Sequence, residues 1–182
     1  MFGRRDYYCH GLLAATLFIA PATYAQFAAT GTTTLSVTVS AEAALSVTTS
    51  TTTLAALGTI FNPYTGTTNL TYKIRTTQST GTGNVTLKVT SDFSPANGPS
   101  VTIPPTAGDA LTYTCTATAP ATGCSSATTA STASATSVAT FGAGASSANA
   151  GNAASTTRSL TNDPVYHTGS YSATVTYTIS AT

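Results

Sequence analysis

Hydrophobic and polar positions alternate without interruption from Phe27 to Val47. The odd positions are apolar or small, counting Thr33 as small, and the even positions mostly carry hydroxyl or other polar groups. A period of two is typical of a β-strand with one buried and one solvated face. The run is too long for one strand, because at about 3.3 Å per residue it would extend roughly 70 Å, whereas most strands end within about 10 residues.

Two interpretations of this run remain open. The chain turns near residues 41–44 and forms two strands of one sandwich, or residues 26–40 form an extended strand that completes the sheet of a neighbouring subunit. Periodicity indicates a buried face without saying which molecule buries it. The predicted self-assembly strand presents on its apolar face Phe27, Ala29, Gly31, Leu35, Val37 and Val39.

The same alternation recurs along the chain. Residues 70–75 and 85–90 each place three apolar side chains on one face, which predicts a hairpin with Ile74 opposite Val85. A short apolar piece at residues 101–103, set among prolines, predicts an edge strand.

The second half contains two more alternating segments, residues 111–117 and 171–179. Between them, residues 116–157 are mostly Ser, Thr, Ala and Gly, which predicts low-complexity surface loops around one or two weak strands. No amphipathic helix is indicated. The predicted fold is an all-β antiparallel sandwich of immunoglobulin-like or jelly-roll type.

The first 25 residues have the pattern of a signal peptide. Arg4 and Arg5 precede an apolar stretch, and small residues end at Ala25. The stretch is too short to span a bilayer, so we expect an exported protein, extracellular or at a bacterial cell surface, with residues 26–182 as its single domain and no transmembrane span.

The expected export determines how the cysteines are interpreted. Cys115 and Cys124 are the two that follow the signal peptide, and an oxidising compartment favours a disulfide between them. With His167 as the sole histidine of this part, the chain offers no zinc-type ligand set, and neither a metal nor a cofactor is expected.

Charged residues are rare at 6% of the chain, and the formal net charge is +1. Near-zero net charge favours association, and four dispersed cations after the signal peptide cannot form a nucleic-acid-binding patch. Catalysis is not expected either: His167 is the one candidate base, and no nucleophile elbow or phosphate loop accompanies it. Paired acids for glycoside hydrolysis would have to come from Glu42, Asp92, Asp109 and Asp163, which are spread through the chain.

Both ends of the predicted domain resemble known surface proteins. The alternating strand behind a signal peptide, and the terminal segment Gly169-Ser170-Tyr171 with Val175-Thr176-Tyr177-Thr178, resemble bacterial fimbrial subunits, including spore-coat-U-like pilins. The terminal strand is also similar to WxL-type surface domains, although the Trp of that motif is absent. The pilin resemblance implies polymerisation by donor-strand exchange, in which an N-terminal extension fills the groove of the next subunit, assisted by a periplasmic chaperone or secretion machinery.

The sequence therefore favours a structural subunit of an extracellular filament or cell-surface assembly whose partners are copies of itself. The alternative is a monomeric secreted module that binds a carbohydrate or surface ligand. Tyr113, Tyr171 and Tyr177 follow the apolar register and are expected in the core, which leaves Tyr64 and Tyr166 as loop residues for stacking on a ligand.

Overall fold

The computed structural model describes residues 31–58 and 60–182. The predicted signal peptide, Phe27 and Ala29 lie outside the described residues. The chain divides into two units, Met1–Val37 and Thr38–Thr182. The described part of the first unit contains no helix or strand, and the second unit holds every strand of the described chain.

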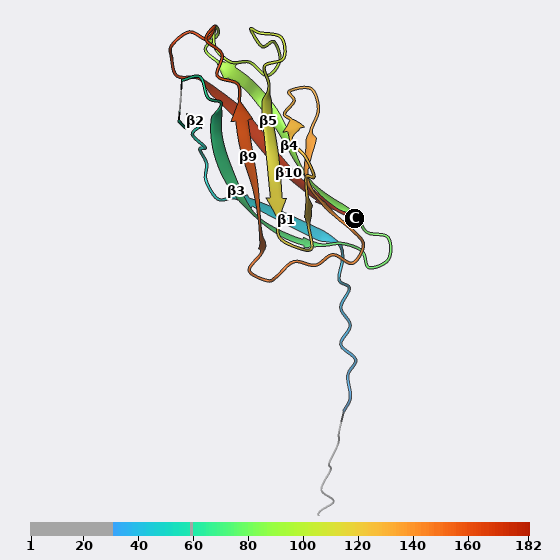
Figure 1. The fold of residues 1–182 in the computed structure, drawn as a ribbon. Helices are drawn as coiled ribbons and strands as arrows, with labels where there is room; N and C mark the ends of the chain where they lie inside the picture. The colour runs from blue at the N-terminus through green and yellow to red at the C-terminus, as the bar shows by residue number, and fades with distance from the viewer. Residues whose placement is uncertain (1–30, 59) are drawn as a thin grey trace, which may run out of the picture. The chain divides into compact units, whose positions relative to one another are not determined.

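The second unit consists of two antiparallel sheets and, in its described residues, no helix (Figure 1). Sheet A has the order β1 (Glu42–Val47), β3 (Tyr64–Arg75), β9 (Asn152–Leu160), β5 (Leu111–Ala117), β7 (Thr128–Thr129), and β2 (Ala55–Ala56) also pairs with β3. Sheet B has the order β10 (Ser172–Ala181), β4 (Gly83–Ser94), β8 (Thr136–Phe141), β6 (Thr122–Gly123).

The inner faces of the two sheets share one hydrophobic core. The β3 side chains Leu70 and Tyr72 and the β4 side chains Val85 and Leu87 are at most 1% exposed. The ring of Tyr72 packs edge-on against Phe141 of β8, with 5.1 Å between the ring centroids. This arrangement agrees with the predicted all-β fold of two packed antiparallel sheets.

The predicted hairpin between residues 70–75 and 85–90 is wrong. β3 pairs with β1, β2 and β9, whereas β4 pairs with β10 and β8. The connector 76–82 crosses from one sheet to the other, so the two apolar faces meet across the core instead of lying side by side. Alternation determined correctly which side chains point inward, but it could not determine which strand lies beside which.

The predicted edge strand at residues 101–103 is also absent from the described structure, and the chain forms a loop there. The carboxylate of Asp92 organises this loop by accepting hydrogen bonds from the amides of Phe93, Val101 and Thr102 and from the hydroxyl of Ser100, at 2.7–3.0 Å. Backbone groups that would have joined a ladder are used by this side chain instead.

The low-complexity region contains more structure than its composition indicates. Besides loops it forms β6, β7, β8 and the first part of β9, and β9 lies in the middle of sheet A between β3 and β5. Its inward positions are Ala154, Thr156, Arg158 and Leu160, all buried. Three of these four are small or polar, which explains why the sequence pattern understated this strand.

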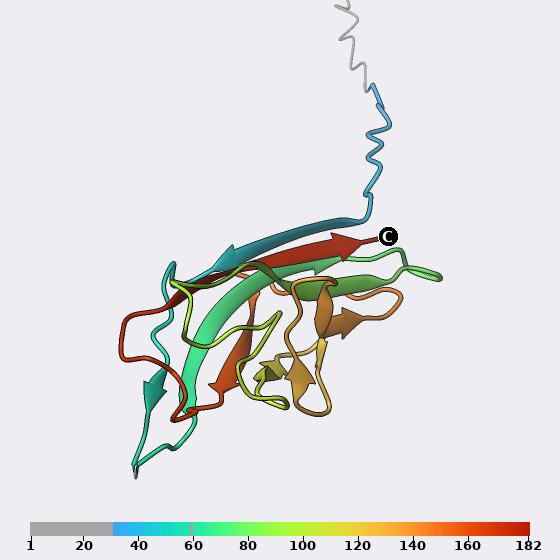
Figure 2. The same cartoon turned by 90° about the horizontal axis from the view of Figure 1, so that it is seen from above.

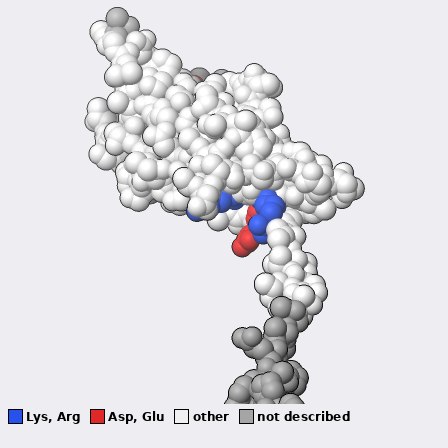
Figure 3. All heavy atoms as spheres, turned by 90° about the horizontal axis from the view of Figure 1, so that it is seen from below, with Lys and Arg blue, Asp and Glu red and all other residues white. Residues whose placement is uncertain are grey.

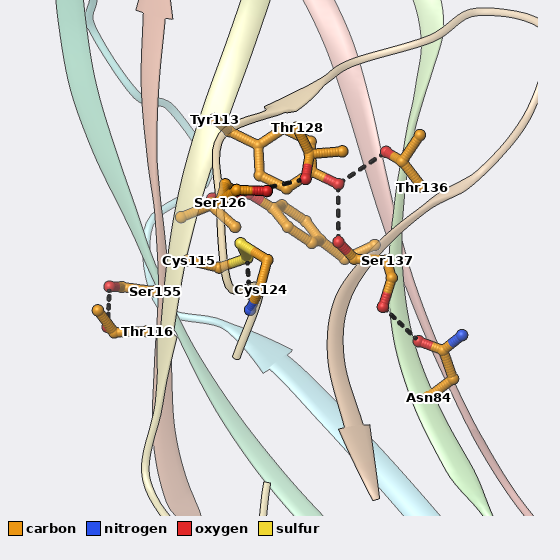
Figure 4. The surroundings of a disulfide bond; sticks show 12 residues. Asn84, Tyr113, Cys115, Thr116, Cys124, Ser126, Thr128, Thr136, Ser137 and Ser155 are labelled. Atoms are coloured by element: carbon orange, nitrogen blue, oxygen red, sulfur yellow. Dashed lines mark hydrogen bonds between the residues drawn. A yellow bond between two sulfur atoms is a disulfide. The ribbon is translucent and has the colours of Figure 1, made fainter. Parts of the chain in front are cut away.

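The predicted disulfide between Cys115 and Cys124 is confirmed, with 5.3 Å between the Cα atoms (Figure 4). Cys115 belongs to β5 of sheet A, and Cys124 directly follows β6 of sheet B, so the bond links the two sheets. Close to it, the hydroxyl of Tyr113 lies 2.7 Å from the hydroxyl of Thr136 and 2.9 Å from the carbonyl oxygen of Ser137. These contacts join β5 to β8 across the core.

Candidate assembly site

Two edge strands, β1 of sheet A and β10 of sheet B, lie beside each other along one side of the sandwich (Figure 2). Within the described residues β1 pairs only with β3, and β10 pairs only with β4, so each has a free edge. We call the line between these edges the β1–β10 seam. Its inward-facing residues are Ala43, Leu45 and Val47 of β1 and Ala173, Val175, Tyr177, Ile179 and Ala181 of β10.

The apolar side chains of the seam are incompletely buried. On β10 every inward-facing residue is half-buried, whereas Val85 and Leu87 of the adjacent β4 are at most 1% exposed. On β1, Ala43 and Leu45 are half-buried, and Val47 is 43% exposed although its ladder partner Leu70 is buried. The core is therefore complete beneath β3 and β4 and incomplete at the seam.

The predicted self-assembly residues of the described chain lie outside any strand. Residues 31–40 are exposed throughout. The exposed fractions of Leu35, Val37 and Val39 are 92%, 87% and 61%, and a Cβ added at Gly31 would meet no atom within 4 Å. Three apolar side chains with a strand-like spacing are thus presented to solvent, which a soluble chain ordinarily avoids.

A buried cation lies next to the seam. Arg158 of β9 is 7% exposed, and its guanidinium donates hydrogen bonds to the hydroxyl of Thr68, at 2.6 Å, and to that of Tyr177, at 2.5 Å. Tyr177 in turn lies 2.5 Å from the hydroxyl of Thr156. The sequence pattern identified Arg158 only as one of four dispersed cations. Its position in register with Ala154 and Leu160 on β9 could have indicated that its side chain is buried.

Few charges surround this site. The ion pair found among the described residues joins Arg75 and Glu42 at 3.2 Å, where β3 ends and β1 begins, and both side chains are exposed. On the face seen in Figure 3, charged side chains occupy a small area, and other residue types form the rest of the visible described surface. Steering by charge is therefore a small effect here.

The loop end of the sandwich contains a shallow hollow of about 450 Å³, lined in part by Phe93, Ile103, Val165 and His167. The tyrosines predicted for ligand stacking do not line it. Tyr64 was expected in a loop, but it begins β3 and packs half-buried against the core.

Tyr166 does lie in a loop, but its hydroxyl is engaged. It donates a hydrogen bond to the carboxylate of Asp109 at 2.9 Å, and burial together with this carboxylate raises the pKa of the Tyr166 phenol. Of the other tyrosines, Tyr113 is buried as predicted, while Tyr171 and Tyr177 are half-buried.

In the described ranges no three His, Cys, Asp or Glu side chains come together as a metal site would require. Nor do those residues form a helix long and apolar enough to cross a membrane. Comparison with models of known protein families, with curated proteins and with solved structures finds no match.

Proposed function

We propose that this protein is a structural subunit of an extracellular filament or cell-surface assembly, in which residues 31–41 of one copy insert as a strand into the β1–β10 seam of the next. One observation carries the proposal: the chain presents a segment that belongs to no strand and has an exposed apolar face and, separately, two free strand edges whose inward side chains are incompletely buried. The segment lacks a strand to pair with, and the edges lack a strand that would cover their inward side chains.

The strand order supports an immunoglobulin-like sandwich that lacks one strand. In that fold one sheet has the order A-B-E-D and the other C-F-G. The run β1-β3-β9-β5 corresponds to the first order, and the neighbours β4 and β10 correspond to C and F. Strand G would lie at the free edge of β10, which is the seam.

The direction of the inserted strand determines what kind of assembly forms. Every strand pair in both sheets is antiparallel, and a strand added antiparallel to β10 runs toward the end where β10 begins. The donor's own β1 begins at Glu42, which lies at the opposite end of the sandwich, beside Arg75 and the connector 76–82. Copies therefore join head to tail, and a heterologous contact of this kind builds an open filament.

Insertion requires the seam to open. Cα atoms of β1 and β10 approach within 8 Å of each other without forming a ladder. An inserted strand needs about 4.8 Å on each side, so the edges must separate to about 9.6 Å. The cost is offset by burial of Leu35, Val37 and Val39, at about 1.5–3 kcal/mol for each fully buried large side chain, and by a new ladder along β10.

The predicted signal peptide and the resemblance to fimbrial subunits agree with this proposal. Assembly then takes place after export, where the Cys115–Cys124 disulfide forms and where a periplasmic chaperone or secretion machinery could hold the seam until the next subunit arrives. No enzymatic step is required.

The test compares two variants of equal charge. Leu35→Asp/Val37→Asp places two carboxylates on the apolar face of the segment, and Thr34→Asp/Ser36→Asp places them on the polar face. Size-exclusion chromatography and negative-stain electron microscopy should show filaments or ladders for the unsubstituted chain and the second variant, and monomers for the first. Equal assembly of both variants, or monomers in all three samples, contradicts strand donation.

The alternative function, a monomeric binding module, is supported by the hollow at the loop end, where Ile103 and Val165 are 78% and 56% exposed. A module of this kind would remain monomeric in the experiment above. It would also lose affinity for its carbohydrate or surface ligand when Ile103 and Val165 are replaced by serine.

A further inference from the structure

The buried guanidinium of Arg158 is incompletely satisfied. Its Nη1 and Nη2 groups have acceptors, but Nε has no hydrogen-bond partner among the described residues. The one ion pair of the described chain lies elsewhere, between Arg75 and Glu42. An unsatisfied buried donor is costly, at about 1–3 kcal/mol, and a charged group costs more. The subunit as it stands therefore lacks one acceptor at this point.

This polar group borders the seam. Thr68 of β3 lies just beyond the end of the β1–β3 ladder, whose last pair is Val47 with Leu70. Tyr177 occupies the middle of β10. The other inward-facing residues of β10 are all apolar, namely Ala173, Val175, Ile179 and Ala181. The β10 side of the seam thus has one polar position, at Tyr177.

The segment 31–41 has one polar side chain on its otherwise apolar or small face. Gly31, Leu35, Val37 and Val39 share this face with Thr33. A threonine hydroxyl accepts as well as donates hydrogen bonds. It can therefore supply the acceptor that the guanidinium lacks.

Resting on the proposed strand donation, we infer that the donated strand binds in the register that places Thr33 opposite Tyr177, with its hydroxyl as a hydrogen-bond acceptor for Arg158. In an antiparallel pair this register sets Leu35 opposite Val175 and Gly31 opposite Ile179. Leu35 and Val37 then meet the apolar positions Val175 and Ala173 of β10, and Val39 extends past Ser172, where β10 begins.

The neighbouring registers are less favourable. A shift of two residues in one direction places Thr33 opposite Ile179, and a shift in the other places it opposite Val175. In both, the hydroxyl is buried among apolar side chains without a partner, and Nε of Arg158 keeps its unpaired donor. A shift of one residue would turn the apolar face of the strand outward. One polar pair therefore selects the register of an otherwise apolar contact.

Disulfide trapping between two separate variants tests the register. One copy carries Val175→Cys, and the other carries Leu35→Cys, Val37→Cys or Thr33→Cys, all in a Cys9→Ser background. Directly opposed residues have Cα atoms about 4.5–5.5 Å apart, within the range that a disulfide spans. After mild oxidation, a covalent dimer on a non-reducing gel should form chiefly from Leu35→Cys with Val175→Cys.

The outcomes distinguish a wrong register from the absence of strand donation. A dominant dimer from Val37→Cys or Thr33→Cys overturns the register while retaining strand donation. No covalent dimer from any of the three mixtures contradicts strand donation itself.

A second measurement tests the polar pair. Thr33→Val should weaken association about tenfold or more, because it removes an acceptor for a charged donor, while Thr33→Ser keeps it. Thr34→Val, on the opposite face, is the matched control and should leave association unchanged. Equal dissociation constants for Thr33→Val and Thr34→Val would overturn the role of Arg158.

Discussion

Arg158 of β9 donates a 2.5 Å hydrogen bond to the phenolic oxygen of Tyr177 on β10, so that a buried cation of one sheet is bonded to the edge strand of the other. The contact joins β9, whose sequence pattern carries little hydrophobic signal, to β10, whose alternation clearly predicted a strand. It also places the one buried cation of the described chain next to the site where a second copy is proposed to bind.

The first prediction concerns this contact. Tyr177→Phe leaves a second donor of Arg158 without an acceptor and should lower the free energy of unfolding by about 1–3 kcal/mol. Adding Arg158→Met should recover part of that loss, because the unpaired charge is removed as well. Urea unfolding is measured in a Leu35→Asp/Val37→Asp background, so that association does not contribute.

The control for this prediction is Tyr171→Phe. Its hydroxyl hydrogen bond to the carbonyl oxygen of His167 is exposed, and the change should stay within about 0.5 kcal/mol. A Tyr177→Phe variant as stable as this control would refute the prediction, as would strictly additive effects at positions 158 and 177.

The second prediction concerns acid stability. Burial alone would raise the pKa of Asp92, but its hydrogen bonds to Val101, Ser100, Thr102 and Phe93 outweigh burial and lower it from 3.8 to about 2. A carboxylate with a lowered pKa stabilises the fold fully above pH 3.8, and the contribution is lost as the pH falls toward 2.

Asp92→Asn should therefore destabilise the protein at neutral pH by about 1 kcal/mol, a modest value because the carboxylate is partly exposed. The difference should shrink between pH 4 and pH 2. Thermal unfolding midpoints of both proteins across this range provide the measurement, and two parallel curves would show that Asp92 does not carry the effect.

The third prediction concerns the disulfide. Replacing Cys115 and Cys124 by serine opens a loop of about ten residues and should lower the free energy of unfolding by about 2–3 kcal/mol. A reductant should lower the urea midpoint of the unsubstituted protein to that of the double variant and leave the double variant unchanged. A reductant that shifts both proteins equally would indicate an effect unrelated to this bond.

The fourth prediction is complementation between defective subunits. Leu35→Asp/Val37→Asp removes the donating face, and Val47→Asp places a charge in the seam at a position already 43% exposed, where the fold tolerates it. Each variant alone should form no filaments. A mixture should form one-to-one dimers and nothing larger, because each dimer has one working strand and one working seam.

Light scattering after size-exclusion chromatography distinguishes these species. Circular dichroism of the Val47→Asp variant establishes that it is folded. Large aggregates in the mixture, or no dimer, would contradict insertion of a strand into a seam.

The sequence predicted which side chains face the core more successfully than it predicted their neighbours. The β4 and β10 patterns were correct because large apolar residues alternate with hydroxyl residues there, and a period of two has one structural interpretation. The partner of β3 was wrong because two inward faces look alike whether they lie in one sheet or in opposing sheets. Only the course of the connector 76–82 distinguishes them.

Two other features required three-dimensional information. β9 was underestimated because a buried strand with Ala154, Thr156 and Arg158 as inward residues carries little hydrophobic signal. The loop organised by Asp92 was missed because one carboxylate can replace the ladder partners of several amides, and no periodicity records that. The half-buried state of the seam likewise depends on which strands are edges, which the sequence does not state.

The segment 31–41 contains no ionisable side chain, and the inward-facing residues of the seam contain none apart from the phenol of Tyr177. Ionic strength should therefore have little influence on how tightly copies adhere, since there is hardly any charge for salt to screen. Temperature should matter more, because apolar burial weakens on cooling. A filament built this way would stay assembled from fresh water to brine and would dissociate more readily in the cold.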